Sequence, residues 1–155
     1  MRRQDREVTD INQIKQILDN CKTCRLAMVD DGQPYVVPLS YAYEIKDNSI
    51  ALYFHSAMEG RKIRILQKNS SVCFEISNEG EPILAGETPC NSGFYYSCVH
   101  GFGDAHFVED VSEKCYALKL LMKHQADMDT DFTPSQAESV CIFKVISSKF
   151  TGKMK

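Results

Sequence analysis

The chain has 155 residues, 43% of them hydrophobic, and a formal net charge of -3, which suits one domain with a core large enough to need no disulfides. Its 18 basic residues against 21 acidic ones argue against a general nucleic-acid-binding protein. The N-terminus is polar, and no segment has the length of a membrane span. We therefore expect a cytoplasmic protein with no nucleic-acid or membrane partner, whose seven cysteines are reduced thiols.

A polar arm and an amphipathic helix are expected at the N-terminus. Residues 1–9 are polar and charged, so they are ordered only if they pack against another element. Asp10 and Gln13 have the spacing of a helix-capping pair, and apolar residues recur every three or four positions after them. The helix is expected to end near Asn20.

Two strands joined by a tight turn follow this helix. A strand over 25–29 leads into Asp31-Gly32, a strong hairpin signal, and the partner strand covers 34–43. Pro38 lies inside the partner strand, where it cannot donate to a sheet ladder. The strand is therefore expected to lie at a sheet edge or to be bulged, which leaves backbone groups free to face a ligand.

A strand that becomes a basic helix is the most distinctive stretch of the sequence. Residues 50–55 predict the strand, and Ser56 with Glu59 has the spacing of a capping box, so Ser56 is the expected N-cap. Arg61 and Lys62 then lie beside the free N–H groups of the helix start, an arrangement that suits a phosphate. The alternative is an ordinary capped surface helix with solvated basic residues.

The next segment predicts two strands separated by a loop. Alternation over 71–77 indicates the first strand, and the composition of 78–93, rich in Glu, Pro and Gly, is typical of a loop. The aromatic run over 94–108 predicts a long strand that bends at Gly101 or Gly103.

A last helix and strand complete the pattern. Asp110 and Glu113 are expected to cap the helix, and 140–146 predicts a sixth strand. Hairpin-linked strands with separate helices and no βαβ alternation imply an α+β fold with an antiparallel barrel. No repeat or composition break marks a second domain, so 1–155 is expected to be one domain.

Two cysteines and one histidine could have either a structural role or a role in a functional site. Cys21 and Cys24 have metal-ligand or redox spacing, but a zinc site needs a second ligand pair that the sequence does not supply. We therefore expect structural thiols and no metal site. His55, at the end of a strand, is either a satisfied core histidine or a site residue.

Five motifs follow one another over nearly the whole chain. They are Arg2-Arg3-x-Asp5-Arg6-Glu7, Arg25-Leu26-Ala27, Pro34-Tyr35-Val36-Val37-Pro38-Leu39, Tyr53-Phe54-His55-Ser56-Ala57-x-x-Gly60-Arg61-Lys62 and Tyr95-x-Ser97-x-x-x-Gly101-x-Gly103. In this order they resemble the FMN-binding split β-barrel proteins related to pyridoxamine 5′-phosphate oxidase, and among those the nitroimidazole-resistance (Nim) flavoproteins.

The resemblance implies a homodimer with FMN at the subunit interface and its phosphate on Arg61 and Lys62. The flavin would pass electrons to a small acceptor, for example a nitroaromatic compound, with His55 as the catalytic residue. Ser97, on the strand over 95–99, would complete the site, with the partner subunit as one source of that strand. The other cofactor contacts implied by the resemblance are Val37, Pro38, Leu39, His55 itself, Ser56 and Ala57.

Two alternatives stay open from the sequence. One is a non-catalytic flavin-binding or sensor protein, and the other is a barrel that holds haem or deazaflavin. The short tail over 149–155 does not supply the additional C-terminal substrate-binding residues of pyridoxamine 5′-phosphate oxidase proper, so oxidation of vitamin B6 is not expected.

Overall fold

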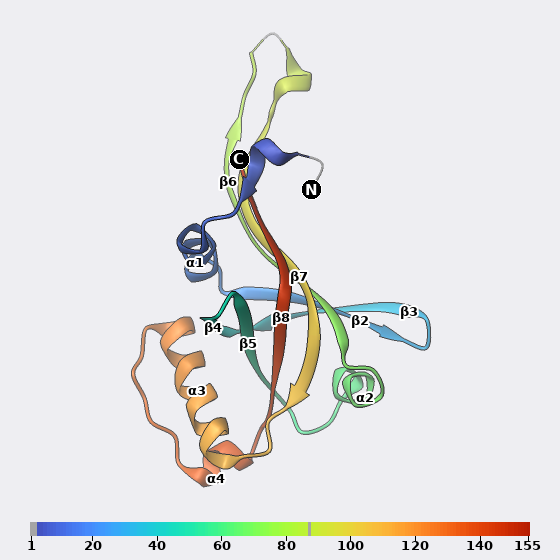
Figure 1. The fold of residues 1–155 in the computed structure, drawn as a ribbon, viewed down its shortest axis with the longest axis vertical. Helices are drawn as coiled ribbons and strands as arrows, with labels where there is room; N and C mark the ends of the chain where they lie inside the picture. The colour runs from blue at the N-terminus through green and yellow to red at the C-terminus, as the bar shows by residue number, and fades with distance from the viewer. Residues whose placement is uncertain (1–2, 87) are drawn as a thin grey trace.

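The computed structural model describes residues 3–86 and 88–155, which form one antiparallel sheet with four α-helices (Figure 1). The strands are β1 (Glu7–Val8), β2 (Thr23–Asp30), β3 (Gln33–Ser40), β4 (Ala42–Lys46), β5 (Ser49–Ser56), β6 (Ser71–Ile83), β7 (Gly93–Phe107) and β8 (Cys141–Met154). The α-helices are α1 (Ile11–Asn20), α2 (Arg61–Lys68), α3 (Val111–Ala126) and α4 (Pro134–Glu138), and short 3-10 helices cover Gln4–Arg6 and Pro89–Asn91.

The sheet is an open barrel. Its hydrogen-bonded order is β3-β2-β6-β7-β8-β5-β4, with β1 added to β8. The edge strand β3 contacts β5 without being its neighbour in the ladder, because the sheet curls strongly. This is the α+β antiparallel split barrel expected from the sequence.

Two apolar clusters hold the elements together. The larger one fills the barrel, and its fully buried side chains include Tyr41, Phe54, Phe74 and Phe143. Along β5 the alternate residues Ile50, Leu52 and Phe54 point into this cluster, as the period of a strand requires. The smaller cluster lies under α3 and includes Tyr53, Leu118 and Leu121, so α3 covers the opposite face of β5.

The helix caps follow the sequence signals at two of the expected positions. Asp10 caps α1 by accepting a hydrogen bond from the backbone N–H of Asn12, and Asp110 caps α3 by accepting from that of Glu113. Within the polar N-terminal arm, β1 pairs with the end of β8 and so packs the arm against the sheet. Residues 1–2 of the expected arm lie outside the described residues.

The expected single strand over 34–43 is wrong, because it is divided between β3 and β4 at opposite ends of the strand order. The chain breaks at Tyr41, which is fully buried and donates its hydroxyl hydrogen to the carbonyl of Leu18 at 2.8 Å. Pro38 lies on an edge strand, as expected, and the register between β2 and β3 runs through it without a bulge.

The expected loop over 78–93 is also wrong in part, because β6 and β7 extend into a long hairpin arm. The arm rises from the barrel beside both chain ends (Figure 1). Its strands pair mainly with each other, so they show little of the apolar alternation that marked 71–77. The last strand likewise runs on past 146 to Met154.

The register irregularity expected near the glycines of β7 lies at Gly103. Phe102 pairs with Lys149 and Asp104 with Ile146, so the extra residue is on β8. A Cβ at Gly103 would stand 2.3 Å from the carbonyl oxygen of Ile146. Only a glycine fits at this crossing.

The cysteines of the C-x-x-C motif are core residues. Cys21 and Cys24 are both buried free thiols, and burial raises the pKa of each. Their burial supports the structural interpretation. Of the helices in residues 3–86 and 88–155, none has the length and apolar character that crossing a membrane would require.

Candidate functional site

The start of α2 differs from the sequence prediction. Ser56 is the last residue of β5, and its hydroxyl donates to the carbonyl of Ala57 at 2.8 Å, so it does not cap the helix. Gly60 is the N-cap instead, with a φ of 143° and no side chain that could accept a hydrogen bond. The expected capping box with Glu59 is therefore wrong. Among the described residues, no side chain accepts a hydrogen bond from the first N–H groups of α2, so these groups are available to an anion.

Arg61, the first residue of α2, is held at the tip of the β2–β3 hairpin. Its Nε donates to a carboxylate oxygen of Asp30 at 2.9 Å, and its guanidinium carbon lies 4.3 Å from the centre of the Tyr35 ring. Its two Nη atoms donate no hydrogen bond to any residue within 3–86 and 88–155. Lys62 is half-buried next to it and forms no ion pair with these residues. Two cationic groups thus lie beside the uncapped helix start.

His55 lies on β5, one residue before the end of the strand, and is exposed. This exposure excludes the interpretation as a satisfied core histidine. Its backbone pairs with Ile142 of β8, and none of the described residues hydrogen-bonds to its ring. The imidazole is therefore accessible to a ligand, as is Ala57 in the turn that follows.

The three predicted residues of β3 lie on the edge strand that contacts β5. Val37 and Leu39 are half-buried and pack against the barrel core, whereas Pro38 is exposed on the other face. Because β3 has a ladder neighbour on one side only, its other side presents backbone groups to whatever approaches. A ligand beside this strand would meet backbone rather than long side chains.

Ser97 is not brought to the other predicted residues within one chain. It pairs with Met154 at the far end of β8 and lines a hollow of about 140 Å³ next to α1. The His55 partner, Ile142, is at the opposite end of the same strand, so up to about 40 Å of strand separates the two positions at ~3.3 Å per residue. Within one chain, Ser97 is therefore not part of the α2 site.

Three residues of this site were not among the predicted site residues. Asp30 and Tyr35 flank the hairpin turn, and their contact with Arg61 joins segments distant in sequence. Cys141 stands opposite Ser56 in the β5–β8 ladder. Burial raises the pKa of the Cys141 thiol, and the adjacent Ser56 hydroxyl and the charges of Lys114 and Lys62 oppose that rise.

Comparison with known protein families decides what kind of barrel this is. The sequence model described as pyridoxamine 5'-phosphate oxidase matches residues 10–153. The chain belongs to this family. None of the curated proteins matches it.

Solved structures of relatives support the family assignment. A candidate 5-nitroimidazole antibiotic resistance protein from Bacteroides thetaiotaomicron is 30% identical, with 96% of this chain and 86% of that chain covered and a TM-score of 0.82. A FAD-binding protein from Mesorhizobium loti is 24% identical, with 97% of each chain covered and a TM-score of 0.69. The flavocytochrome Anf3 from Azotobacter vinelandii is 18% identical, with 100% and 72% covered and a TM-score of 0.78. The last two show a shared fold.

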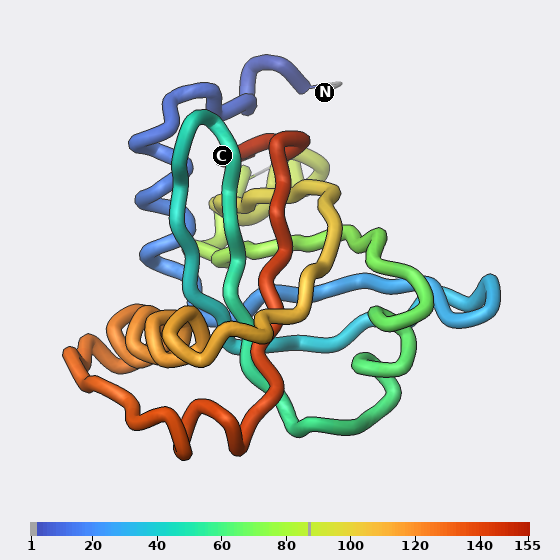
Figure 2. Tube along the Cα trace, turned by 60° about the horizontal axis from the view of Figure 1, so that its bottom comes forward, coloured from blue at the N-terminus to red at the C-terminus, as the bar shows by residue number. Residues whose placement is uncertain are grey.

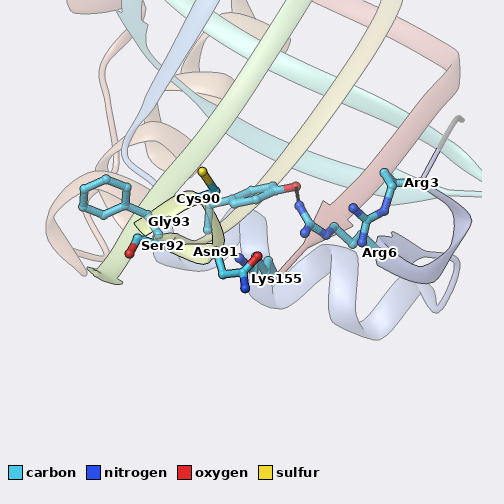
Figure 3. Close-up of a pocket in the computed structure, with 9 residues that line it drawn as sticks. Arg3, Arg6, Cys90, Asn91, Ser92, Gly93 and Lys155 are labelled. Atoms are coloured by element: carbon cyan, nitrogen blue, oxygen red, sulfur yellow. Dashed lines mark hydrogen bonds between the residues drawn. The ribbon is translucent and has the colours of Figure 1, made fainter. Parts of the chain in front are cut away.

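A second basic region of this family member lies at the root of the hairpin arm (Figure 3). A hollow of about 620 Å³ is lined there by Arg3 and Arg6 of the N-terminal arm, by residues of the β6–β7 hairpin arm, and by Lys155. Arg3 is paired with both carboxylate oxygens of Asp5, at 2.7 and 2.6 Å, and Arg6 donates to the Tyr96 hydroxyl at 3.4 Å. Arg3 therefore uses two of its nitrogens on Asp5, whereas Arg61 uses only Nε on Asp30.

Proposed function

We propose that this protein is a cytoplasmic, homodimeric flavoprotein that holds FMN and passes electrons to a small acceptor. The observation that carries the proposal is the uncapped start of α2 with Arg61 and Lys62 beside it. A phosphate at this point would accept hydrogen bonds from backbone N–H groups and charge-assisted hydrogen bonds from Arg61 and Lys62. All seven cysteines are free thiols, which suits a reducing compartment.

The relatives support a flavin at this site. Flavin binding appears in the names of a FAD-binding protein and of a flavocytochrome that share this fold, and the 30% identical relative is named for nitroimidazole resistance. We infer FMN because the two adjacent cations and the single helix N-terminus suit one phosphate group. A nitroaromatic compound is the proposed acceptor.

The chain's own groups would divide the work. A bound flavin supplies electron transfer between a reductant and an acceptor. Arg61 and Lys62 would anchor its phosphate, and the open side of β3 around Pro38 would offer backbone groups to a planar polar edge. His55, exposed at the end of β5, would exchange a proton with the substrate through its imidazole.

The outer face of the sheet supports the homodimer. Val36, Ala27, Cys73 and Phe102 form one row across β3, β2, β6 and β7, because their backbone positions are paired in register. Val36 and Phe102 are 55% and 57% exposed, so both ends of the row present an apolar side chain that a second copy could cover. A second copy covering this row would also be the source of Ser97 for the α2 site.

A charge in this row tests the homodimer. Phe102→Lys is expected to shift the protein to monomers in sedimentation and to release its flavin, whereas Met128→Lys, at an exposed residue outside the sheet, is the control. An unchanged dimer with full flavin content in Phe102→Lys would contradict the proposed interface.

The visible spectrum of the protein as isolated tests the cofactor, and its reduction tests the activity. We expect a yellow chromophore that a nicotinamide donor bleaches and a nitroaromatic acceptor restores, with FMN as the flavin released by heat. A Soret band, a deazaflavin spectrum or FAD in the released fraction would each overturn the FMN assignment.

One observation favours a non-catalytic flavin-binding protein as the second candidate. No group among the described residues orients the His55 ring by a hydrogen bond, whereas catalytic bases are commonly oriented by a second residue. Bound flavin that no donor and acceptor pair can turn over would select this candidate.

A further inference from the structure

The turn between β2 and β3 fixes where Asp30 and Tyr35 stand. Asp31 and Gly32 have φ values of 48° and 84°, as a two-residue type I′ hairpin turn requires. Asp30 then pairs with Gln33 and Tyr35 with Met28, in a register without a slip. The positions of both residues are therefore set by the backbone geometry of the hairpin itself.

These two side chains hold the Arg61 guanidinium from two directions. Asp30 accepts a hydrogen bond from its Nε at one edge, at 2.9 Å, while the Tyr35 ring covers one of its faces at 4.3 Å. Tyr35 is itself half-buried against the barrel core, so the ring is a fixed platform. Figure 2 shows the hairpin tip and α2 on the same side of the barrel, and the two elements are in contact.

The contacts leave one edge of the guanidinium free. Nε donates to Asp30, while the Nη atoms donate no hydrogen bond to any of the described residues. An arginine whose orientation is already fixed loses less side-chain freedom when it binds an anion. The hairpin therefore fixes the orientation of Arg61 for binding an anion, without contacting that anion itself.

We propose that Asp30 and Tyr35 are positioning residues that hold Arg61 ready for a phosphate monoester, so that the β2–β3 hairpin sets the preference for a phosphorylated flavin over riboflavin. This inference rests on the proposed function. The Asp30 carboxylate also carries a negative charge close to the bound phosphate. Its geometric effect must therefore outweigh its repulsion, and the test separates the two.

The test is the ratio of the affinities for FMN and riboflavin, measured by fluorescence quenching with protein stripped of its flavin. Asp30→Ala and Tyr35→Leu are each expected to lower this ratio about threefold, and the double variant about tenfold. Asp30→Asn keeps a hydrogen-bond acceptor and Tyr35→Phe keeps the ring, so both rescue the ratio to within about twofold of the original. Riboflavin affinity stays constant throughout, because riboflavin has no phosphate.

The outcomes separate this inference from the proposed function. An unchanged ratio in Asp30→Ala, with a lowered ratio in Arg61→Ala, would overturn the positioning role and leave the phosphate anchor intact. An unchanged ratio in the Arg61→Ala and Lys62→Ala double variant would overturn the anchor as well. A ratio that rises in Asp30→Ala would show that charge repulsion dominates, which also contradicts the inference. Asp30 is the last residue of β2, next to an exposed turn, so Asp30→Ala is expected to fold. It therefore tests the positioning role even if Tyr35→Leu does not fold.

Discussion

The start of α2 and the root of the hairpin arm both gather basic side chains, but they differ in what those side chains already bind. At the arm, Arg3 donates two hydrogen bonds to the carboxylate of Asp5, and Arg6 donates one to the Tyr96 hydroxyl. At α2, Arg61 is bound through Nε alone, next to helix N–H groups that no side chain caps.

The difference shows that a hollow with basic walls is not by itself a phosphate site. The arm region has a hollow of about 620 Å³, yet Arg3 there already donates to both carboxylate oxygens of Asp5, whereas Arg61 uses only Nε on Asp30. The α2 region offers unpaired donors from both backbone and side chains. What distinguishes a binding site here is the hydrogen-bonding capacity that the fold leaves unused.

Removing both cations at α2 gives the largest expected effect. Each charge-assisted contact to a phosphate contributes about 1.5–3 kcal/mol, so Arg61→Ala with Lys62→Ala is expected to weaken FMN about 10²–10⁴-fold. Flavin content after purification and titration of the stripped protein measure this loss. Riboflavin serves as the control ligand, and retention of FMN at full occupancy would contradict the anchor.

Replacing His55 is expected to affect turnover more than binding. A positioned proton donor contributes about 10²–10⁴-fold to a rate, and because no described group orients this ring, we expect the lower end of that range or less in His55→Ala. FMN content and the melting temperature should stay close to those of the original protein, since His55 is exposed. A variant that fails to fold would reinstate a structural role for the ring.

The ion pair at the arm predicts the behaviour of Asp5 with pH. The hydrogen bond from Arg3 lowers the pKa of Asp5 to about 2, so the carboxylate remains charged and keeps Arg3 neutralised in any milder acid. Because the pKa of the folded state is depressed, the stabilisation is present at neutral pH and is lost only on strong acidification. An NMR titration of the Asp5 carboxyl carbon checks this, and in Arg3→Ala the midpoint should rise towards about 3.9.

Removing the arm cations gives the smallest expected effect on the cofactor. Arg3→Ala with Arg6→Ala should leave FMN affinity within about twofold, because both arginines already have partners. A loss comparable to that at α2 would break the comparison. It would mean that the arm of one subunit contributes to the phosphate site of the other.

Local chemistry in the sequence was sufficient to place several elements. Asp10 and Asp110 marked the starts of α1 and α3, and Asp31-Gly32 marked the hairpin. The caps depend on side chains that bond to backbone within a few residues, and the turn depends on residues that tolerate positive φ, so these signals operate in any fold. The five motifs, in their order along the sequence, were also sufficient to indicate the family.

Local signals failed where the surrounding fold set the outcome. Ser56 had the right spacing for a cap, but the ladder with Cys141 keeps it in β5 and moves the helix start to Gly60. Tyr41 divides an apparently continuous strand because its hydroxyl is bonded to α1 inside the core. In each case a long-range contact competes with a local preference and wins.

The sequence by itself thus determined the family, the barrel class and the basic character of the α2 start. Tertiary structure alone decided that Arg61 is held by Asp30 and Tyr35, and that Ser97 lies at the other end of β8. The reason is physical. Periodicity and capping depend on neighbours in the chain, whereas which strand ends meet depends on the register and curl of the whole sheet.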